Sequence, residues 1–277
     1  MSVIYINPYA FSAPWTPAEI TTALWLDAAD QTTLFTTDAG STQSTNGTEV
    51  GRWNDKSGNA RNATQTASAN RPSCLTNALN GRQGVQFSSN ARWLEVTDES
   101  PFDFTSTLYT FAVCSVSNVT NSNVLVNKGR NTFNNTGWYL AVSASTSNLA
   151  LIGITSNGSW SSVDINASLS ANTPIIMSHE VNGSTVRARG NGTTYQTAVN
   201  NKAAWAATAN NDTLLVGAIV TSSSTANFEG LAHQIIVMSS VPSLSIIEKL
   251  EGWAAHYYGL TANLPSGHPY KTAAPTV

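Results

Sequence analysis

Apolar and polar residues alternate in many short segments along this 277-residue chain. Successive side chains of an extended strand point to opposite faces of a sheet, so a period of two predicts a half-buried strand. The segments with this pattern, or with a compact apolar run of similar length, are residues 22–27, 84–88, 93–97, 109–116, 123–127, 137–142, 149–154, 174–181, 185–189, 213–220 and 230–238. We expect each of them to form a β-strand.

The residues between these segments are typical of turns. Asn-Gly or Ser-Gly pairs occur at residues 46–47, 57–58, 157–158, 182–183 and 191–192. Asn182-Gly183 stands between two predicted strands, which is the strongest short-range signal for a hairpin. Many short strands separated by turns, without alternating helices, predict an all-β sandwich of two antiparallel sheets.

One segment has helical spacing instead. After Pro242, Ser243 is a suitable N-cap, and Gly259 is a suitable residue to end the helix. The apolar residues of one helical face are Ile246, Ile247, Leu250, Trp253 and Ala254. We therefore expect a short C-terminal helix over residues 243–258, packed on the sandwich as a satellite.

Composition narrows the function classes. Charged residues make up 10% of the chain, against about 25% in an average protein, while Ser, Thr and Asn supply about a third. The net charge is −3 without any block of like charge, which argues against nucleic acid and membrane surfaces as partners. No apolar run approaches the about 20 residues that span a bilayer. The N-terminus has no basic region followed by a long apolar one, so we read it as mature sequence and not as a signal peptide.

The first residues form a segment of their own. Residues 1–15 contain two prolines and precede the first strong strand signal. Their apolar residues are Ile4, Tyr5, Ile6, Tyr9 and Phe11. Such a strand is an aggregation hazard when it is exposed, so we expect an attachment or oligomerisation arm. The alternative is an additional edge strand of the chain's own sandwich.

Several separated motifs carry a family resemblance. They are Trp25-Leu-Asp-Ala-Ala-Asp30, Val50-Gly-Arg-Trp-Asn-Asp-Lys-Ser-Gly-Asn59, Ala63-Thr-Gln65, Arg71-Pro72, Asn80-Gly81, Val85-Gln-Phe87, Phe228-Glu-Gly-Leu-Ala232, Leu250-Glu-Gly-Trp-Ala-Ala-His256, Gly259-Leu260, Leu264-Pro265 and His268-Pro-Tyr-Lys271. In this order they resemble the concanavalin A-like, LamG-type domains common in phage structural proteins and in some bacterial surface proteins. The chain departs from that pattern at Gln234, where the family commonly has Glu, and at Tyr257-Tyr258, where its helix often ends in Lys-Trp.

The resemblance implies a jelly-roll sandwich over residues 16–277. It also implies a non-enzymatic virion protein, a capsid decoration, head-fibre or tail-associated protein that is assembled in the host cytoplasm. Its partners would be other virion proteins and further copies of itself. Since this fold hosts many functions, a carbohydrate-binding (receptor-binding) module is the alternative, and a secreted glycoside hydrolase comes third.

The residue pattern does not favour catalysis. Glycoside hydrolysis needs two carboxyl groups about 5–9.5 Å apart, which two acids alternating on one strand would supply. The nearest cluster is Glu95, Asp98 and Glu99, whose spacing is wrong and which leads into a loop. The histidines are isolated, and His179 and His233 alternate with apolar residues within strands. We interpret these two as structural histidines with satisfied hydrogen bonds, and the chain as no enzyme.

Metal binding is a weaker hypothesis. Asp27, Asp30, Asn54 and Asp55 offer only oxygen ligands in loops, which suits Ca²⁺, and some LamG-type relatives carry this ion. The alternative is that these aspartates accept hydrogen bonds from the backbone of their own loops, as Asp55 before the turn at Gly58 would do. No other cofactor is expected.

Aromatic residues near loops are the candidates for glycan contacts. Trp160, Trp205 and Tyr195 lie outside the family motifs and next to predicted turns, and flat aromatic rings flanked by amides and hydroxyls bind sugars. A buried or interface tryptophan is the competing interpretation. We expect the motif residues Trp25, Trp53 and Phe87 to face inward as part of the core.

Overall fold

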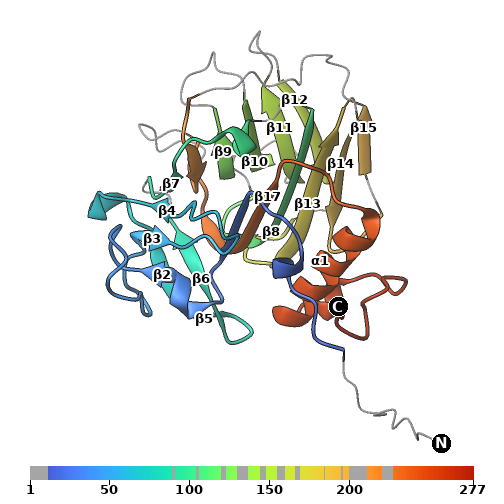
Figure 1. Cartoon of the computed structure of the whole chain (residues 1–277), viewed down its shortest axis with the longest axis horizontal. Helices are drawn as coiled ribbons and strands as arrows, with labels where there is room; N and C mark the ends of the chain where they lie inside the picture. The colour runs from blue at the N-terminus through green and yellow to red at the C-terminus, as the bar shows by residue number, and fades with distance from the viewer. Residues whose placement is uncertain are drawn as a thin grey trace, which may run out of the picture.

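Two antiparallel β-sheets stack face to face in the computed structural model (Figure 1). The structure describes residues 12–88, 91–103, 106–119, 123–129, 137–143, 148–154, 160–165, 169–183, 185–194, 196–199, 211–219 and 227–277. The two sheets, with one α-helix in this described part of the chain, confirm the predicted jelly-roll sandwich.

The first sheet contains eight strands. They are β1 (Leu24–Asp27), β5 (Ser73–Leu79), β6 (Arg82–Phe87), β8 (Thr107–Val116), β13 (Ile175–Asn182), β14 (Thr185–Gly190), β15 (Gln196–Val199) and β17 (Gly230–Met238). Their order is β15-β14-β13-β8-β17-β6-β5, and β1 pairs with β17. The predicted hairpin is β13–β14, in which Asn182 pairs with Thr185.

The second sheet contains nine strands. They are β2 (Leu34–Phe35), β3 (Arg52–Trp53), β4 (Ala63–Thr64), β7 (Leu94–Val96), β9 (Asn123–Lys128), β10 (Gly137–Ser143), β11 (Asn148–Ile154), β12 (Trp160–Ile165) and β16 (Leu214–Val216). Their order is β12-β11-β10-β9-β16-β7-β4-β3-β2. The edge strand β12 lies against β14 and β15 of the first sheet, so the two sheets approach each other at this side.

The helix α1 (Leu244–Tyr257) forms within the predicted range. Short 3₁₀ turns are η1 (Pro17–Glu19), η2 (Gln31–Thr33), η3 (Ser68–Asn70), η4 (Ser100–Phe102) and η5 (Thr261–Asn263). None of the helices in the described part of the chain is long and apolar enough to cross a membrane.

The main core fills the space between the two sheets. Trp53 and Phe87 are 0% and 2% exposed there, which confirms their predicted inward orientation. Trp25 is also buried, but it belongs to a second apolar cluster between the first sheet and α1. Because Leu24 and Leu26 face the main core, the pleat of β1 turns Trp25 to the opposite face. Trp25 is thus a buried core residue as predicted, but it lies in the layer between the first sheet and α1 and not between the two sheets.

Helix α1 covers the outer face of the first sheet (Figure 1). Ile247 and Leu250 of the helix are fully buried against apolar side chains such as Phe111 and Ile236 of β8 and β17. The helix therefore closes a second apolar layer, and its position sets the geometry of the site described below.

The two ends of the described chain lie side by side. Pro14 forms an antiparallel bridge with Thr276, and Trp15 donates its backbone N–H to the Pro275 carbonyl oxygen at 3.0 Å. Trp15 is 2% exposed. Residues 1–11 lie outside the described residues, and with them Ile4, Tyr5, Ile6, Tyr9 and Phe11, so the attachment arm stays a prediction.

Candidate binding pocket

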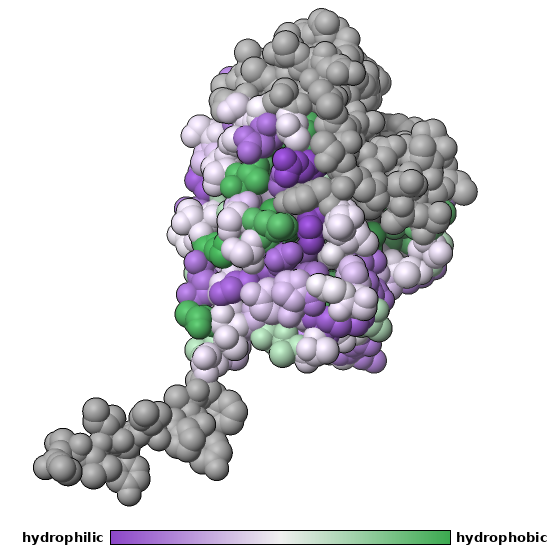
Figure 2. Space-filling view, turned by 90° about the vertical axis from the view of Figure 1, so that its right-hand side faces the viewer, coloured by the Kyte–Doolittle hydropathy of each residue, from purple (hydrophilic) through white to green (hydrophobic). Residues whose placement is uncertain are grey.

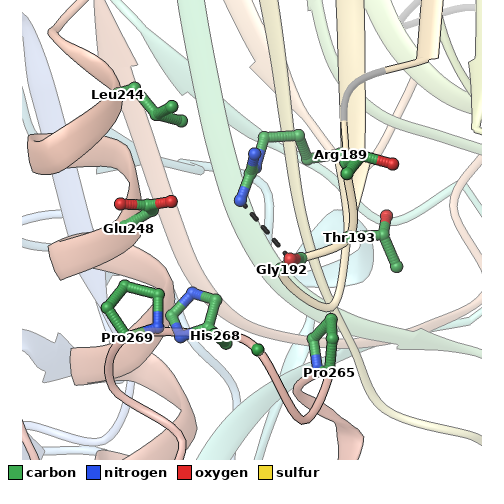
Figure 3. Close-up of a pocket in the computed structure, with 10 residues that line it drawn as sticks. Arg189, Gly192, Thr193, Leu244, Glu248, Pro265, His268 and Pro269 are labelled. Carbon is green, nitrogen blue, oxygen red and sulfur yellow. Dashed lines mark hydrogen bonds between the residues drawn. The ribbon is translucent and has the colours of Figure 1, made fainter.

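A pocket of about 560 Å³ opens between the start of α1, the turn after β14 and the C-terminal tail (Figure 3). Leu244 and Glu248 of the helix face Arg189 and Thr193 across it, and the tail closes its lower side. The residues that line it are Arg189, Gly192, Thr193, Thr194, Leu244, Glu248, Pro265, Gly267, His268 and Pro269.

The turn after β14 is held by its local sequence. Asn191 and Gly192 both have positive φ, at 50° and 71°, a conformation that Asn and Gly tolerate best. The Asn191 side chain accepts a hydrogen bond from the Ile176 backbone N–H at 3.0 Å, which ties the turn to β13. A Cβ atom at Gly192 would lie 2.7 Å from His268 Cδ2. Glycine is therefore required here for the turn and for the close approach of the tail.

The floor of the pocket is formed by Arg189, which is held in a buried ion pair with Glu251, a residue that does not itself line the pocket. Arg189 Nε lies 2.7 Å from Glu251 Oε1, and Arg189 Nη2 lies 2.8 Å from Glu251 Oε2. The two residues are 5% and 1% exposed. This bidentate geometry fixes both side chains, and removing one partner would leave an uncompensated buried charge.

His268 joins the floor from the tail. Its Nδ1 accepts a hydrogen bond from the Tyr270 backbone N–H at 3.2 Å. The other nitrogen, Nε2, lies 3.3 Å from Glu251 Oε2. Because Nδ1 is an acceptor, the proton is on Nε2, which donates to the carboxylate. The tail is thus bonded to the helix through Glu251.

The rest of the His268-Pro-Tyr-Lys271 motif fastens the tail over α1. The Tyr270 ring packs on Gly252, where a Cβ atom would clash with it. Lys271 Nζ donates to the carbonyl oxygens of Thr261 at 2.7 Å and Leu264 at 2.6 Å. The motif is architectural, and it makes the pocket wall a fixed surface.

The wall of the pocket combines hydroxyl, carboxylate and apolar groups. Thr193 and Thr194 are exposed, and Leu244 is 46% exposed. Glu248 is half-buried, and its carboxylate has no ion pair or hydrogen bond to another described residue. On the face of the molecule in Figure 2, hydrophobic residues among those described form small separate patches between polar ones. A pocket wall that combines hydroxyl, carboxylate and apolar groups suits a ligand that carries several hydroxyl groups.

Two of the predicted calcium ligands, Asp27 and Asp30, hold a lysine instead. Lys56 Nζ lies 3.2 Å from Asp27 Oδ2 and 2.8 Å from Asp30 Oδ2. It also lies 4.7 Å from the centroid of the Trp25 ring. No group of three or more His, Cys, Asp or Glu residues in the described part of the chain is placed to hold a metal ion.

Electrostatics at this lysine follow from burial and pairing. Burial raises the pKa of Asp27, although the charge of Lys56 opposes the shift. Burial alone would raise the pKa of Asp30 too, but hydrogen bonds from Lys56 and Thr32 lower it. Burial would lower the pKa of Lys56, whereas its bonds to both aspartates raise it.

Asp55 and Asn54 do not join this cluster. Asp55 Oδ1 accepts the backbone N–H groups of Trp25 and Ser57, each at 2.9 Å. Asn54 Oδ1 accepts from Arg52 Nε at 2.7 Å. The Asp55 contacts match the alternative interpretation, in which an aspartate supports its own loop.

The two strand histidines are buried, and they differ in their hydrogen bonds. Both are 1% exposed. Among the described residues, neither ring nitrogen of His179 has a hydrogen-bond partner, whereas His233 Nδ1 forms a long hydrogen bond of 3.4 Å with the Gln83 carbonyl oxygen. Gln234 is 0% exposed, and neither its amide oxygen nor its amide nitrogen has a hydrogen-bond partner in the part of the chain that the structure describes. The expectation of satisfied hydrogen bonds was wrong for His179, whose ring lies on a covered face of β13, and is met at one ring nitrogen for His233.

The acids considered for catalysis are engaged elsewhere. Glu95 Oε1 accepts from the Trp93 indole N–H at 2.8 Å. Asp98 Oδ1 lies 2.7 Å from Nζ of Lys128, which is 1% exposed.

The structure places the predicted glycan residues only in part. Trp160 begins the edge strand β12, but its side chain is not among those described, and Trp205 and Tyr195 lie outside the described residues. Tyr195 follows Thr194, which lines the pocket. Sequence reasoning missed Arg189, Glu248 and Glu251. Glu251 did offer a signal, since it stands four residues after Ile247 on the apolar face of the helix.

Comparison with known proteins supports the fold. No family model matches the chain, and no curated protein matches its sequence. Domain 4 of AbnA, a GH43 extracellular arabinanase from Geobacillus stearothermophilus solved with arabinotriose, is 13% identical. It has a TM-score of 0.57, and the match covers 72% of this chain and 92% of that domain.

Two further structures that match this chain are larger proteins, and the match covers half of each. The receptor-binding domain of botulinum neurotoxin mosaic serotype C/D is 14% identical with a TM-score of 0.56, covering 83% of this chain and 50% of that one. A GH54 α-L-arabinofuranosidase is 14% identical with a TM-score of 0.52, covering 73% and 50%. The chain thus spans about half the length of these two neighbours. At such identities the likeness shows the fold alone, and the virion role stays a prediction.

Proposed function

We propose that the chain is a carbohydrate-binding module and that the pocket beside α1 holds the sugar. The observation that carries this proposal is the pocket itself, in which threonine hydroxyls, the Glu248 carboxylate and the exposed Leu244 surround a rigid ionic floor. Sugars are bound by a few fixed polar groups together with apolar contacts to their C–H faces. The GH43 domain solved with arabinotriose and the receptor-binding domain of the toxin lend this proposal coarse support through their shared fold.

Gly267 offers a clean way to test the pocket. It lines the cavity, its φ is not in the left-handed region, and a Cβ atom there would meet nothing within 4 Å. Gly267→Trp should therefore fill the pocket without straining the fold. Ser266→Trp is the matched control, because Ser266 is an exposed neighbour that does not line the pocket.

The experiment is a screen of the purified chain against an oligosaccharide array, followed by calorimetry on the best ligands. We expect binding that Gly267→Trp weakens at least about tenfold and Ser266→Trp leaves unchanged, since a filled pocket excludes the sugar. A chain that binds no glycan overturns the proposal. Binding that survives Gly267→Trp would place the site elsewhere, with Trp160, Trp205 and Tyr195 as the next residues to change.

We propose in addition that this module binds without hydrolysing. The engagement of Glu95 and Asp98 in other contacts supports this. Incubation with a panel of polysaccharides should release no reducing sugar. Turnover that is lost in Glu95→Ala or Asp98→Ala would contradict it.

The sequence resemblance supports one setting for such a module, an outward-facing part of a phage virion that is attached through residues 1–11. Purified particles should then contain the chain, and antibodies against it should label their surface. Its absence from particles of the phage that encodes it would refute this setting and leave the pocket unaffected.

A further inference from the structure

We infer that the pocket selects neutral sugars and rejects anionic ones, with Glu248 as the residue that decides. This inference rests on the proposed glycan binding at the same site. It names the charge class of the ligand.

Arg189, the one arginine or lysine among the described residues of the pocket lining, is already neutralised. Arg189 directs Nε and Nη2 at the two carboxylate oxygens of Glu251, at 2.7 and 2.8 Å. Arg189 Nη2 also points at the Gly192 carbonyl oxygen, at 3.4 Å (Figure 3). A guanidinium that is held bidentate and 5% exposed has little charge to offer an incoming carboxylate or sulfate.

Glu248 then sets the sign of the net charge of the pocket lining. Because Glu251 neutralises Arg189, the Glu248 carboxylate gives the described lining one net negative charge. Helix α1 begins at Leu244 on the same rim, and a helix N-terminus by itself favours an anion. The first turn of α1 carries no acidic residue, and Glu248, one turn further along, places its negative charge in the pocket against this preference.

The same carboxylate is a good partner for an uncharged sugar. An ionised carboxylate accepts hydrogen bonds from hydroxyl groups, and these are stronger than bonds between neutral groups. The hydroxyls of Thr193 and Thr194 can donate or accept across the pocket, and Leu244 provides an apolar contact for the C–H face. A carboxylate or sulfate of the ligand at hydrogen-bonding distance from Glu248 would instead meet a like charge, which weakens binding about tenfold or more.

The test compares neutral oligosaccharides with uronic, sialylated and sulfated ones on the wild-type chain and on three variants. Glu248→Gln keeps the shape and removes the charge, and Glu248→Lys reverses it. Glu19→Lys is the matched control, because Glu19 is exposed in η1 and the variant changes the total charge by the same amount. Melting temperatures establish that each variant is folded.

The wild-type chain should bind neutral sugars at least about tenfold more tightly than acidic ones. Glu248→Gln should narrow this difference, Glu248→Lys should reverse it, and Glu19→Lys should leave it unchanged. Tight binding of acidic sugars by the wild type that Gly267→Trp abolishes would overturn the inference while the proposed function stands. Selectivity that Glu248→Lys does not change would overturn it too. If no sugar binds at all, the proposed function itself has failed.

Discussion

Acid should destabilise this fold because of two buried histidines. His179 and His233 are each 1% exposed. His179 lies between Met177 and Val181 of β13 on the face that packs into the main core. Burial lowers the pKa of His179 to about 3 and that of His233 to about 4. Folding therefore holds both rings neutral at a pH where the unfolded chain would protonate them.

The sign and the size follow from proton linkage. A folded pKa below the unfolded value of about 6.5 means that the unfolded chain binds more protons in acid, so stability falls as the pH falls. Between pH 7 and pH 5 each histidine should cost about 2 kcal/mol, which is nearly the same for any folded pKa of 4 or lower. The loss begins near pH 6.5 and levels off as the pH passes through about 4 and about 3. A total of about 4 kcal/mol is a large part of the stability of a typical domain.

Urea denaturation at pH 7, 6 and 5, followed by tryptophan fluorescence, measures this loss. Asp27 acts in the opposite direction, because a raised carboxyl pKa favours the folded state on acidification. The comparison with variants is therefore decisive. His179→Leu and His233→Gln should each reduce the difference in the free energy of unfolding between pH 7 and pH 5 by about 2 kcal/mol. The reasoning would be refuted if the wild type were equally stable at pH 7 and pH 5 and if both variants showed the same dependence of the free energy of unfolding on pH as the wild type.

Three further predictions concern stability and attachment. Glu251→Gln should lower the free energy of unfolding by about 3–5 kcal/mol, because it leaves the buried Arg189 charge uncompensated. Glu248→Gln should change this free energy by about 0.5 kcal/mol or less. Equal urea midpoints for the two variants would argue against a structural role of the ion pair. Trp53→Ala should cost about 3–5 kcal/mol in the same assay, as for a fully buried aromatic side chain, and an unchanged melting temperature would place Trp53 at the surface. Deletion of residues 1–11 spares the pairing of residues 13–15 with residues 275–277. It should therefore leave the melting temperature unchanged and abolish oligomerisation or particle binding, as measured by light scattering and co-sedimentation. Unfolding of the truncated chain would show that the segment is an integral strand.

Several elements could be read from local patterns. The alternation in residues 109–116 and 230–238 predicted β8 and β17 because a half-buried strand imposes that period on its own sequence. Asn182-Gly183 predicted its hairpin, and the spacing after Ser243 predicted α1. The strands β2, β3, β4, β5, β12 and β15 were missed, because none of them shows a sustained alternation. β5 is rich in polar residues and has a break in register between Leu75 and Leu79, and β2, β3 and β4 are two residues long.

The sequence by itself determined where most strands and the helix lie, and that they build an all-β sandwich, because periodicity and turn chemistry act between near neighbours in the chain. Only the tertiary structure decided which distant groups meet. It placed the ammonium of Lys56 between Asp27 and Asp30, where loop oxygens alone had suggested Ca²⁺. It brought Arg189 to Glu251, 62 residues along the chain, and left Glu248 facing the pocket beside them. Charge pairing depends on distance in space, and that distance is fixed only when α1 and the tail close over the first sheet.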